Sequence, residues 1–259
     1  GASPARETSP EQYPGVWELT EQFQAQADGN WPFQAADCAP KSLRLDQASS
    51  AYLTRTPVAA GNRKTWTFNC WIKRLKQGGT SGTQDFILTS IPNLTHYFQI
   101  YFSSDLLYIQ GIQSGQSSAW TLTTNQVFRD PSAWMMLTFV HDSTQATASE
   151  RFKVYLNGQR ITSFSTNTLS SYLPQNSDSA INSTQVQRIG TQSPYSSVHS
   201  DLMIAEATLI DGQALEPTDF GFYDGQGIWQ PKRFTGDYSS GPVYSNAVPT
   251  ADGFRPNRI

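Results

Sequence analysis

One segment, TWTFNCWIKR at residues 65–74, limits the folds open to this chain more than any other. Its side chains alternate, because Trp66, Phe68, Cys70 and Ile72 are apolar and the residues between them are mixed. Successive side chains of a β-strand point to opposite faces, so this alternation predicts a strand with one buried face. Further strand-like segments follow at short intervals, starting near residues 42, 85, 96, 106, 119, 134, 152, 184 and 201.

The clearest turn signal lies in FKVYLNGQRITSF, which begins at residue 152. Two alternating runs meet there at Asn157-Gly158. Both residue types tolerate positive φ, which the type I′ turn of a two-residue hairpin requires. Many strands, regular turns and little helix predict an all-β fold, an antiparallel sandwich over residues 42–212.

Residues 1–41 have a different pattern. Residues 1–14 contain three prolines and predict an extended arm. A short helix should follow, because apolar residues then recur at spacings of three and four, and Asp28-Gly29-Asn30 should end it. A helix of about three turns is marginal on its own in water, so we expect it to dock on a partner subunit or on the sandwich. The bulky residues expected to dock are Trp17, Phe23 and Trp31.

Residues 213–259 are rich in glycine, proline and aromatic residues but show no sustained period. We expect an irregular segment that lies over the sandwich, because large aromatic side chains are rarely left in water. The expected packing anchors are Phe220, Phe222, Trp229 and Phe234.

Charge and cysteine content exclude several classes of protein. The net charge of −3 and pI near 5.6 provide no field that would attract nucleic acid. No apolar run approaches the roughly 20 residues that span a bilayer, so we expect no membrane insertion. Cys38 and Cys70 do not make a disulfide framework. We expect Cys70 to be a buried free thiol, and a bridge to Cys38 is the alternative.

The acidic residues do not form a catalytic pattern. Retaining glycoside hydrolysis needs two carboxylates about 5 to 5.5 Å apart. Within the strand region the glutamates are Glu150 and Glu206, and Glu206 is five residues from Asp211. On a regular strand that spacing places the two on opposite faces. His96, His141 and His199 lack metal-ligand spacing, so we expect a module that is not an enzyme.

The ordered segments TFNCWIKR, WMMLTFVHD, FKVYLNGQRI, RIGTQ and LMIAEATLIDGQALEPTDFG resemble the laminin-G-like, concanavalin-A-like jelly-roll superfamily. The ending IDGQALEPTDFG, followed by WQPKRFTGDY, is similar to a branch found in structural proteins of tailed bacteriophages. GVWELTEQFQAQADGNWP is similar to a segment that those proteins carry near junctions with other virion parts. The last thirty or so residues depart from the pattern at Ser239-Ser240-Gly241-Pro242.

The resemblance implies a jelly-roll module in a tailed-phage virion, as a tail-fibre, head-fibre or capsid decoration component assembled in the bacterial host cytoplasm. It also implies other virion proteins as partners, and a homo-oligomer. A receptor-binding lectin for host-surface carbohydrate is the alternative, and an adhesion module unrelated to phage is a third possibility.

Carbohydrate recognition uses exposed aromatic rings beside amide or carboxylate groups. Each aromatic candidate could equally pack in the core or across strands. The candidates are Tyr97, Tyr101, Tyr108, Trp120 and Tyr195. Laminin-G-like domains sometimes hold Ca²⁺ at the rim, and loop aspartates could converge there, but spacing alone does not assign such ligands. The aspartates are Asp105, Asp142, Asp178 and Asp201. We therefore assign no metal and no cofactor.

Overall fold

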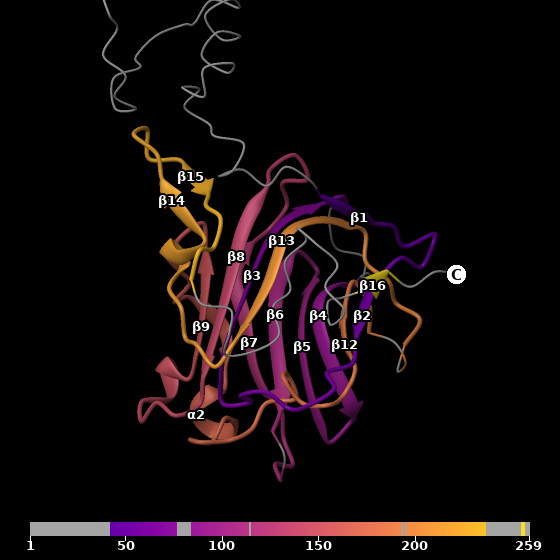
Figure 1. Cartoon of the computed structure of the whole chain (residues 1–259), viewed down its shortest axis with the longest axis vertical. Helices are drawn as coiled ribbons and strands as arrows, with labels where there is room; N and C mark the ends of the chain where they lie inside the picture. The colour runs from indigo at the N-terminus through magenta and orange to yellow at the C-terminus, as the bar shows by residue number, and fades with distance from the viewer. Residues whose placement is uncertain are drawn as a thin grey trace, which may run out of the picture.

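The computed structural model describes residues 42–76, 84–113, 115–192, 194 and 196–236, and the backbone of 255–256. These residues form two large antiparallel sheets that pack face to face, with only one short α-helix, α2 (Leu169–Tyr172) (Figure 1). Two single-turn 3₁₀ helices, η1 (Ala148–Glu150) and η2 (Pro217–Asp219), lie in connections. The expected all-β jelly-roll sandwich is confirmed.

Non-sequential neighbours define both sheets. The six-stranded sheet has the order β1 (Leu43–Leu45), β13 (Leu202–Asp211), β3 (Thr65–Arg74), β8 (Met135–Asp142), β9 (Phe152–Leu156) and β10 (Gln159–Arg160). The eight-stranded sheet has the order β11 (Phe164–Asn167), β7 (Trp120–Val127), β6 (Leu106–Ile112), β5 (His96–Ser103), β4 (Gln84–Asn93), β12 (Gln187–Ile189), β2 (Leu53–Arg55) and β16 (Arg255–Pro256).

The Asn157-Gly158 hairpin forms as expected. Asn157 has φ 47° and Gly158 has φ 80°, the two positive values that a type I′ turn needs. The returning strand is shorter than the alternation suggested. β10 ends at Arg160, and the chain then crosses to the other sheet, where β11 pairs with β7.

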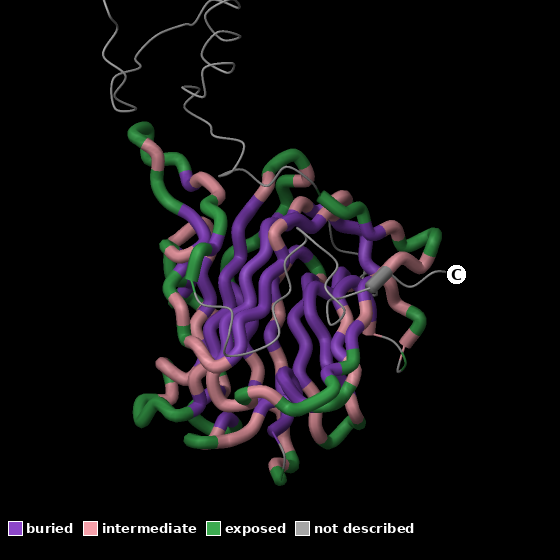
Figure 2. The backbone as a smooth tube through the Cα atoms, viewed as in Figure 1, coloured by how far each residue is buried: buried purple, intermediate pink, exposed green. Residues whose placement is uncertain are grey.

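The space between the sheets is filled by aromatic and aliphatic side chains. Trp66, Phe68, Cys70 and Ile72 are all fully buried there, which confirms the expected face of β3. Cys70 is a buried free thiol, as expected, and Cys38 lies outside the described residues. Figure 2 shows buried residues along the strands of both sheets and exposed residues mainly in the connections.

The segment after Gly212 covers the outer face of the six-stranded sheet. Thr67 Oγ1 on β3 donates to Gln213 O at 2.8 Å and accepts from Leu215 N at 2.9 Å. A short hairpin interrupts the otherwise irregular path and pairs β14 (Gly221–Tyr223) with β15 (Trp229–Pro231). A second hydrophobic cluster forms beneath this segment, made of Trp71, Met136, Ala205, Ile210, Phe220, Trp229 and Phe234.

The expected anchors Phe220, Trp229 and Phe234 are confirmed, whereas Phe222 is wrong because its side chain is 44% exposed. Gly221 and Tyr223, on either side of Phe222 in β14, face Trp229. Because successive side chains of a strand point to opposite faces, Phe222 points to solvent. Residues 1–41 lie outside the described residues. Docking by Trp17, Phe23 and Trp31 therefore stays a prediction.

Candidate functional site

Three of the expected tyrosines share the outer face of the eight-stranded sheet. On β5, Phe98, Ile100 and Phe102 point into the core, so the alternating residues point outward. The register places Gln99 opposite Gln110 and Tyr101 opposite Tyr108 on β6. We call this surface the tyrosine–glutamine face, and its members are Tyr97, Gln99, Tyr101, Tyr108 and Gln110.

Hydrogen bonds between side chains fix the amides on this face. Gln99 Nε2 donates to Gln110 Oε1 at 2.9 Å, and the Tyr101 hydroxyl donates to the same oxygen at 3.1 Å. Gln110 Nε2 reaches Thr121 Oγ1 on β7 at 3.5 Å. The network therefore ties three adjacent strands together and orients the polar groups before any ligand arrives.

The segment after β12 extends the network from the side. Thr89 Oγ1 on β4 donates to Thr191 O at 2.9 Å, which holds this segment against the sheet. Gln192 Nε2 then donates to Gln99 Oε1 at 3.0 Å, and Ser196 Oγ donates to Gln192 Oε1 at 2.8 Å. The segment thus borders the tyrosine–glutamine face. Tyr195 belongs to the same stretch of sequence but lies outside the described residues.

The tyrosine rings are supported from below. Tyr101 stacks on Tyr108 with ring centroids 5.2 Å apart and an interplanar angle of 9°, and it also contacts Phe86. Tyr101 is only 6% exposed, whereas Tyr97 and Tyr108 are half-buried. Burial raises the pKa of Tyr97 and of Tyr101, so both phenols stay protonated at neutral pH. Tyr97 and Tyr108 are the rings that a ligand could touch.

Trp120 is not part of this face, and its expected role in glycan contact is wrong. Its side chain is 0% exposed and lies between the sheets, with ring centroids 5.1 Å from Phe152 and 6.0 Å from Phe98. The physical reason is that side chains alternate between the two faces of a strand. Trp120 and Leu122 point inward on β7, and Thr121 between them points outward.

Amide groups beside the tyrosines were expected from the sequence, but the individual glutamines were not predicted. Tyr97, Gln99 and Tyr101 alternate at a period of two, as do Tyr108 and Gln110, so strand phase could have placed them on one face. Gln192 had no local signal, because its contact with Gln99 joins residues 93 positions apart.

A cation lies farther along the same outer face. Arg188 on β12 pairs with Thr89, which in turn pairs with Gln99, so the three residues lie in one row across adjacent strands. Burial lowers the pKa of Arg188, and nearby Tyr52 opposes that shift. Tyr52 stacks on His199 with ring centroids 5.7 Å apart. Arg188 forms no ion pair with another described residue.

The four loop aspartates considered for Ca²⁺ have separate partners. Asp105 pairs with Arg74 and Arg129, both at 3.0 Å. The other three also find partners nearby: Asp201 pairs with Lys76, Asp178 with Arg63, and Asp142 accepts from Thr144 and Gln145. Within the described ranges, no group of three His, Cys, Asp or Glu side chains is placed to hold a metal ion.

The two perturbed carboxylates on β13 lie apart. Burial raises the pKa of both Glu206 and Asp211. Glu206 has a φ of 47° at a β-bulge, and nearby Arg233 lowers its pKa in part. Asp211 pairs with Trp66 on the inner side of β3 and accepts from Asn62 N at 2.7 Å. The bulge therefore leaves these carboxylates on different faces, where they do not converge on one bond.

The histidines are also dispersed. His141 lies in the core against Trp66, His96 contacts Arg63, and His199 stacks on Tyr52. Among the described elements, no helix has the length and apolar character needed to cross a membrane.

No protein-family model matches the sequence, and no curated protein matches it. Solved structures share part of the fold. A heptameric SAP-like pentraxin from Limulus polyphemus is 14% identical, with a TM-score of 0.40 over 64% of this chain and 71% of the pentraxin. The botulinum neurotoxin serotype D binding domain is 11% identical, with a TM-score of 0.48 over 68% of this chain and 40% of that domain.

The serotype G binding domain is 13% identical, with a TM-score of 0.45 over 69% of this chain and 40% of that domain. The chain thus spans about two fifths of the length of these neurotoxin domains. At these scores the similarities do not assign a function to this chain.

Proposed function

We propose that the chain is a non-enzymatic carbohydrate-recognition module that binds through the tyrosine–glutamine face. The main supporting observation is that the half-buried rings of Tyr97 and Tyr108 lie on the same face as the glutamine amides, which hydrogen bonds already hold in place. A sugar ring offers C–H groups to an aromatic surface and hydroxyls to amide groups. Polar groups held in place before binding lose little conformational entropy when the ligand arrives.

The face suits a ligand that lies across the strands. Gln110 and Thr121 are partly exposed next to Tyr108, and the segment bearing Gln192 borders them. Hydroxyls of a saccharide would exchange hydrogen bonds with the amides, and Tyr108 would contact the ring. Arg188, in the same row as Gln99, adds a positive charge that favours acidic sugars at that end.

A glycan array with purified protein tests this proposal. The wild type should bind one class of sugar, and Tyr108→Ala should remove that signal. Tyr172→Ala is the control, because Tyr172 is a tyrosine accessible to solvent that lies on α2 and not on this face. A blank array with folded wild-type protein, or equal binding by Tyr108→Ala, would contradict carbohydrate recognition by this face.

We further propose that the module is carried on the virion of a tailed phage, as a fibre or decoration component, with residues 1–41 attaching it to other virion proteins. Two observations support this. The segments quoted above resemble phage structural proteins, and described residues between Leu45 and Phe234 fill the space between and beside the sheets. The resemblance also favours a homo-oligomer, which light scattering after size-exclusion chromatography would measure.

Deleting residues 1–41 tests the attachment. The remaining chain should keep the circular dichroism of the full chain but no longer join particles. Substituting Trp17, Phe23 and Trp31 by alanine together should have the same effect. Undiminished attachment would show that another part of the chain docks, and absence from any particle would favour an adhesion module unrelated to phage.

A further inference from the structure

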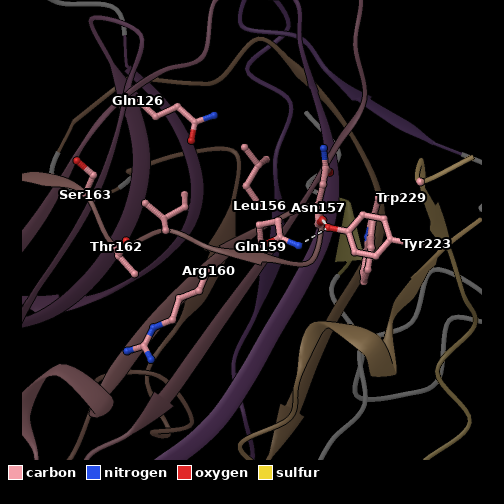
Figure 3. A pocket seen from close by; sticks show the side chains of 11 residues that line it. Gln126, Leu156, Asn157, Gln159, Arg160, Thr162, Ser163, Tyr223 and Trp229 are labelled. Carbon is pink, nitrogen blue, oxygen red and sulfur yellow. Dashed lines mark hydrogen bonds between the residues drawn. The ribbon is translucent and has the colours of Figure 1, made fainter.

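A pocket of about 560 Å³, shown in Figure 3, lies at the edge of the sandwich and shares no lining residue with the tyrosine–glutamine face. It forms where the chain leaves β10 and crosses toward β11, and the β14–β15 hairpin faces it. Pockets that hold small ligands span about 300 to 1,000 Å³. Its lining includes Gln126, Asn157, Gln159, Arg160, Thr162 and Tyr223.

One wall of the pocket is an aromatic ring held at its hydroxyl. The Tyr223 hydroxyl donates to Asn157 O at 2.7 Å and accepts from Gln159 Nε2 at 2.7 Å. Its ring meets Trp229 edge to face, with centroids 4.7 Å apart. Tyr223 is nevertheless 44% exposed. A ring that is both fixed and exposed offers a ligand contact area at little loss of side-chain entropy.

Trp229 behind this ring is itself fixed. Its Nε1 donates to Met136 Sδ at 3.3 Å, and its ring lies over the backbone of Gly158 and Gly221. A Cβ at Gly158 would lie 2.4 Å from this ring, and one at Gly221 would lie 2.5 Å from it. Because neither glycine has a Cβ, the Trp229 ring can pack against their backbone. This aromatic wall of the pocket is therefore formed without a ligand.

The opposite wall carries hydrogen-bonding groups. Figure 3 shows Gln126 and Thr162 across the pocket from Tyr223. Both are exposed, and neither side chain bonds to another residue in the part of the chain that is described. An amide and a hydroxyl with free donors and acceptors, facing an aromatic ring, suit a ligand that has both hydroxyls and an apolar face.

The charge in the pocket is balanced. Arg160 is the charged residue in its lining, and its guanidinium contacts the two Glu150 carboxylate oxygens at 2.9 and 3.2 Å. It also donates to Ser149 O at 2.9 Å. Glu150 therefore offsets the charge of Arg160 and reduces its attraction for a ligand carboxylate. The pocket therefore favours a neutral ligand.

We propose that this pocket is a second binding site, specific for a neutral saccharide residue. The sugar's C–H face packs on Tyr223, and its hydroxyls bond to Gln126 and Thr162. This inference does not rest on the proposed role of the tyrosine–glutamine face, because the two sites share no residue. Two sites on one module would let a longer glycan bind at two points, which raises its overall affinity.

Nuclear magnetic resonance of the ¹⁵N-labelled full chain tests the proposal. The probes are the methyl glycosides of neutral hexoses and N-acetylhexosamines, with methyl glucuronide as the acidic comparison. The indole N–H signal of Trp229, assigned with Trp229→Phe, should shift with a neutral glycoside. Gln126→Ala and Thr162→Ala should each weaken that binding about fivefold, the effect of one lost neutral hydrogen bond.

Gln185→Ala and Thr166→Ala are the matched controls, because both positions are exposed outside the pocket, and they should leave the affinity unchanged. Tyr108→Ala should also leave it unchanged, which separates this site from the tyrosine–glutamine face. An unmoved Trp229 signal with every glycoside, or preference for the glucuronide, would overturn the inference. Equal binding by the Gln126→Ala, Thr162→Ala double variant would do the same.

Discussion

At the scale of single residues, His141 is a titratable group enclosed by the core. It stacks on Trp66 with ring centroids 5.2 Å apart and lies 6.0 Å from Phe152. Neither ring nitrogen has a hydrogen-bond partner among the described residues. Burial lowers the pKa of His141 to about 3, although nearby Asp142 opposes that shift. The imidazole is therefore neutral in the folded protein at every pH above that value.

This burial makes stability depend on pH. In the unfolded chain the histidine takes up a proton below its ordinary pKa of 6.5, whereas in the folded protein it does not until about 3. The unfolded state then binds more protons, so the free energy of unfolding falls as the pH drops through this window. From pH 6.5 to 4.5 the loss should be about 2 kcal/mol.

Urea unfolding at the two pH values measures this effect in the wild type and in His141→Phe. The phenylalanine keeps an aromatic ring against Trp66 but does not titrate. The variant should lose about 2 kcal/mol less than the wild type on acidification. Equal losses would show that His141 does not control the acid sensitivity.

Gly158 is a second position where one residue determines local structure. It has a φ of 80° in the hairpin turn, and a Cβ there would lie 2.4 Å from the Trp229 ring. Gly158→Ala should therefore lower the free energy of unfolding by backbone strain of about 1 to 3 kcal/mol, plus the cost of displacing the tryptophan.

Gly227→Ala is the matched control for this prediction. Gly227 has a φ of 78°, but a Cβ there would meet nothing within 4 Å. It should show the backbone strain alone, so chemical denaturation should find Gly158→Ala the less stable variant. If the two variants unfold at the same denaturant concentration, the contact with Trp229 contributes nothing.

At the scale of elements, a buried ion network joins the two sheets. Arg74 at the end of β3 pairs with Asp85 on β4 at 3.4 Å and with Asp105 in the β5–β6 turn at 3.0 Å. Its guanidinium also donates to Phe128 O at 2.6 Å and lies over the Phe102 ring. Burial raises the pKa of Asp85, and the charge of Arg74 opposes that shift.

Removing this cation should be costly. Arg74→Met would leave the carboxylates of Asp85 and Asp105 without it, which typically destabilises a protein by about 3 to 5 kcal/mol. Arg44→Met is the control, because the Arg44–Asp46 pair is exposed and 3.9 Å long, and such pairs contribute less than about 1 kcal/mol. Thermal unfolding of both variants makes the comparison, and similar losses would contradict a structural role for the network.

The length of a strand determines how well the sequence could predict it. Long strands such as β3, β8 and β13 are rich in apolar and β-branched residues, so the sequence could predict them, although only β3 shows clear alternation of its side chains. Short strands such as β2 and β14 have three residues each and no period to read, and they form because neighbouring strands pair with them.

Strand phase also explains the result for the candidate site. Tyr97, Tyr101 and Tyr108 share a face because each lies in the outward phase, whereas Trp120 lies in the inward phase of β7. Choosing residues by type alone missed that distinction. Gln192 contacts Gln99, and Tyr223 lies against the pocket residues that follow β10. In both cases the residues are distant in sequence, so only the folded chain brings them together.

At the scale of the whole molecule, the jelly-roll sandwich provides two differently built surfaces. The six-stranded sheet is covered on its outer side by the segment after Gly212. The eight-stranded sheet instead presents the tyrosine–glutamine face, whose amides are joined across β5, β6 and β7. This difference is why we propose that the outer face of the eight-stranded sheet, rather than that of the six-stranded sheet, is the main recognition surface.

Calorimetric titration of Gln110→Ala, with the glycan that binds best on the array, is the sharpest test of carbohydrate binding by the tyrosine–glutamine face. Gln110 accepts from both Gln99 and Tyr101, so its loss removes a ligand contact and releases two neighbours. We expect the variant to bind at least about tenfold more weakly, since more than one hydrogen bond of about 1 kcal/mol is lost. Gln185→Ala should bind as the wild type does. Equal affinity of Gln110→Ala and wild type, with both proteins folded, would show that this face does not bind the glycan.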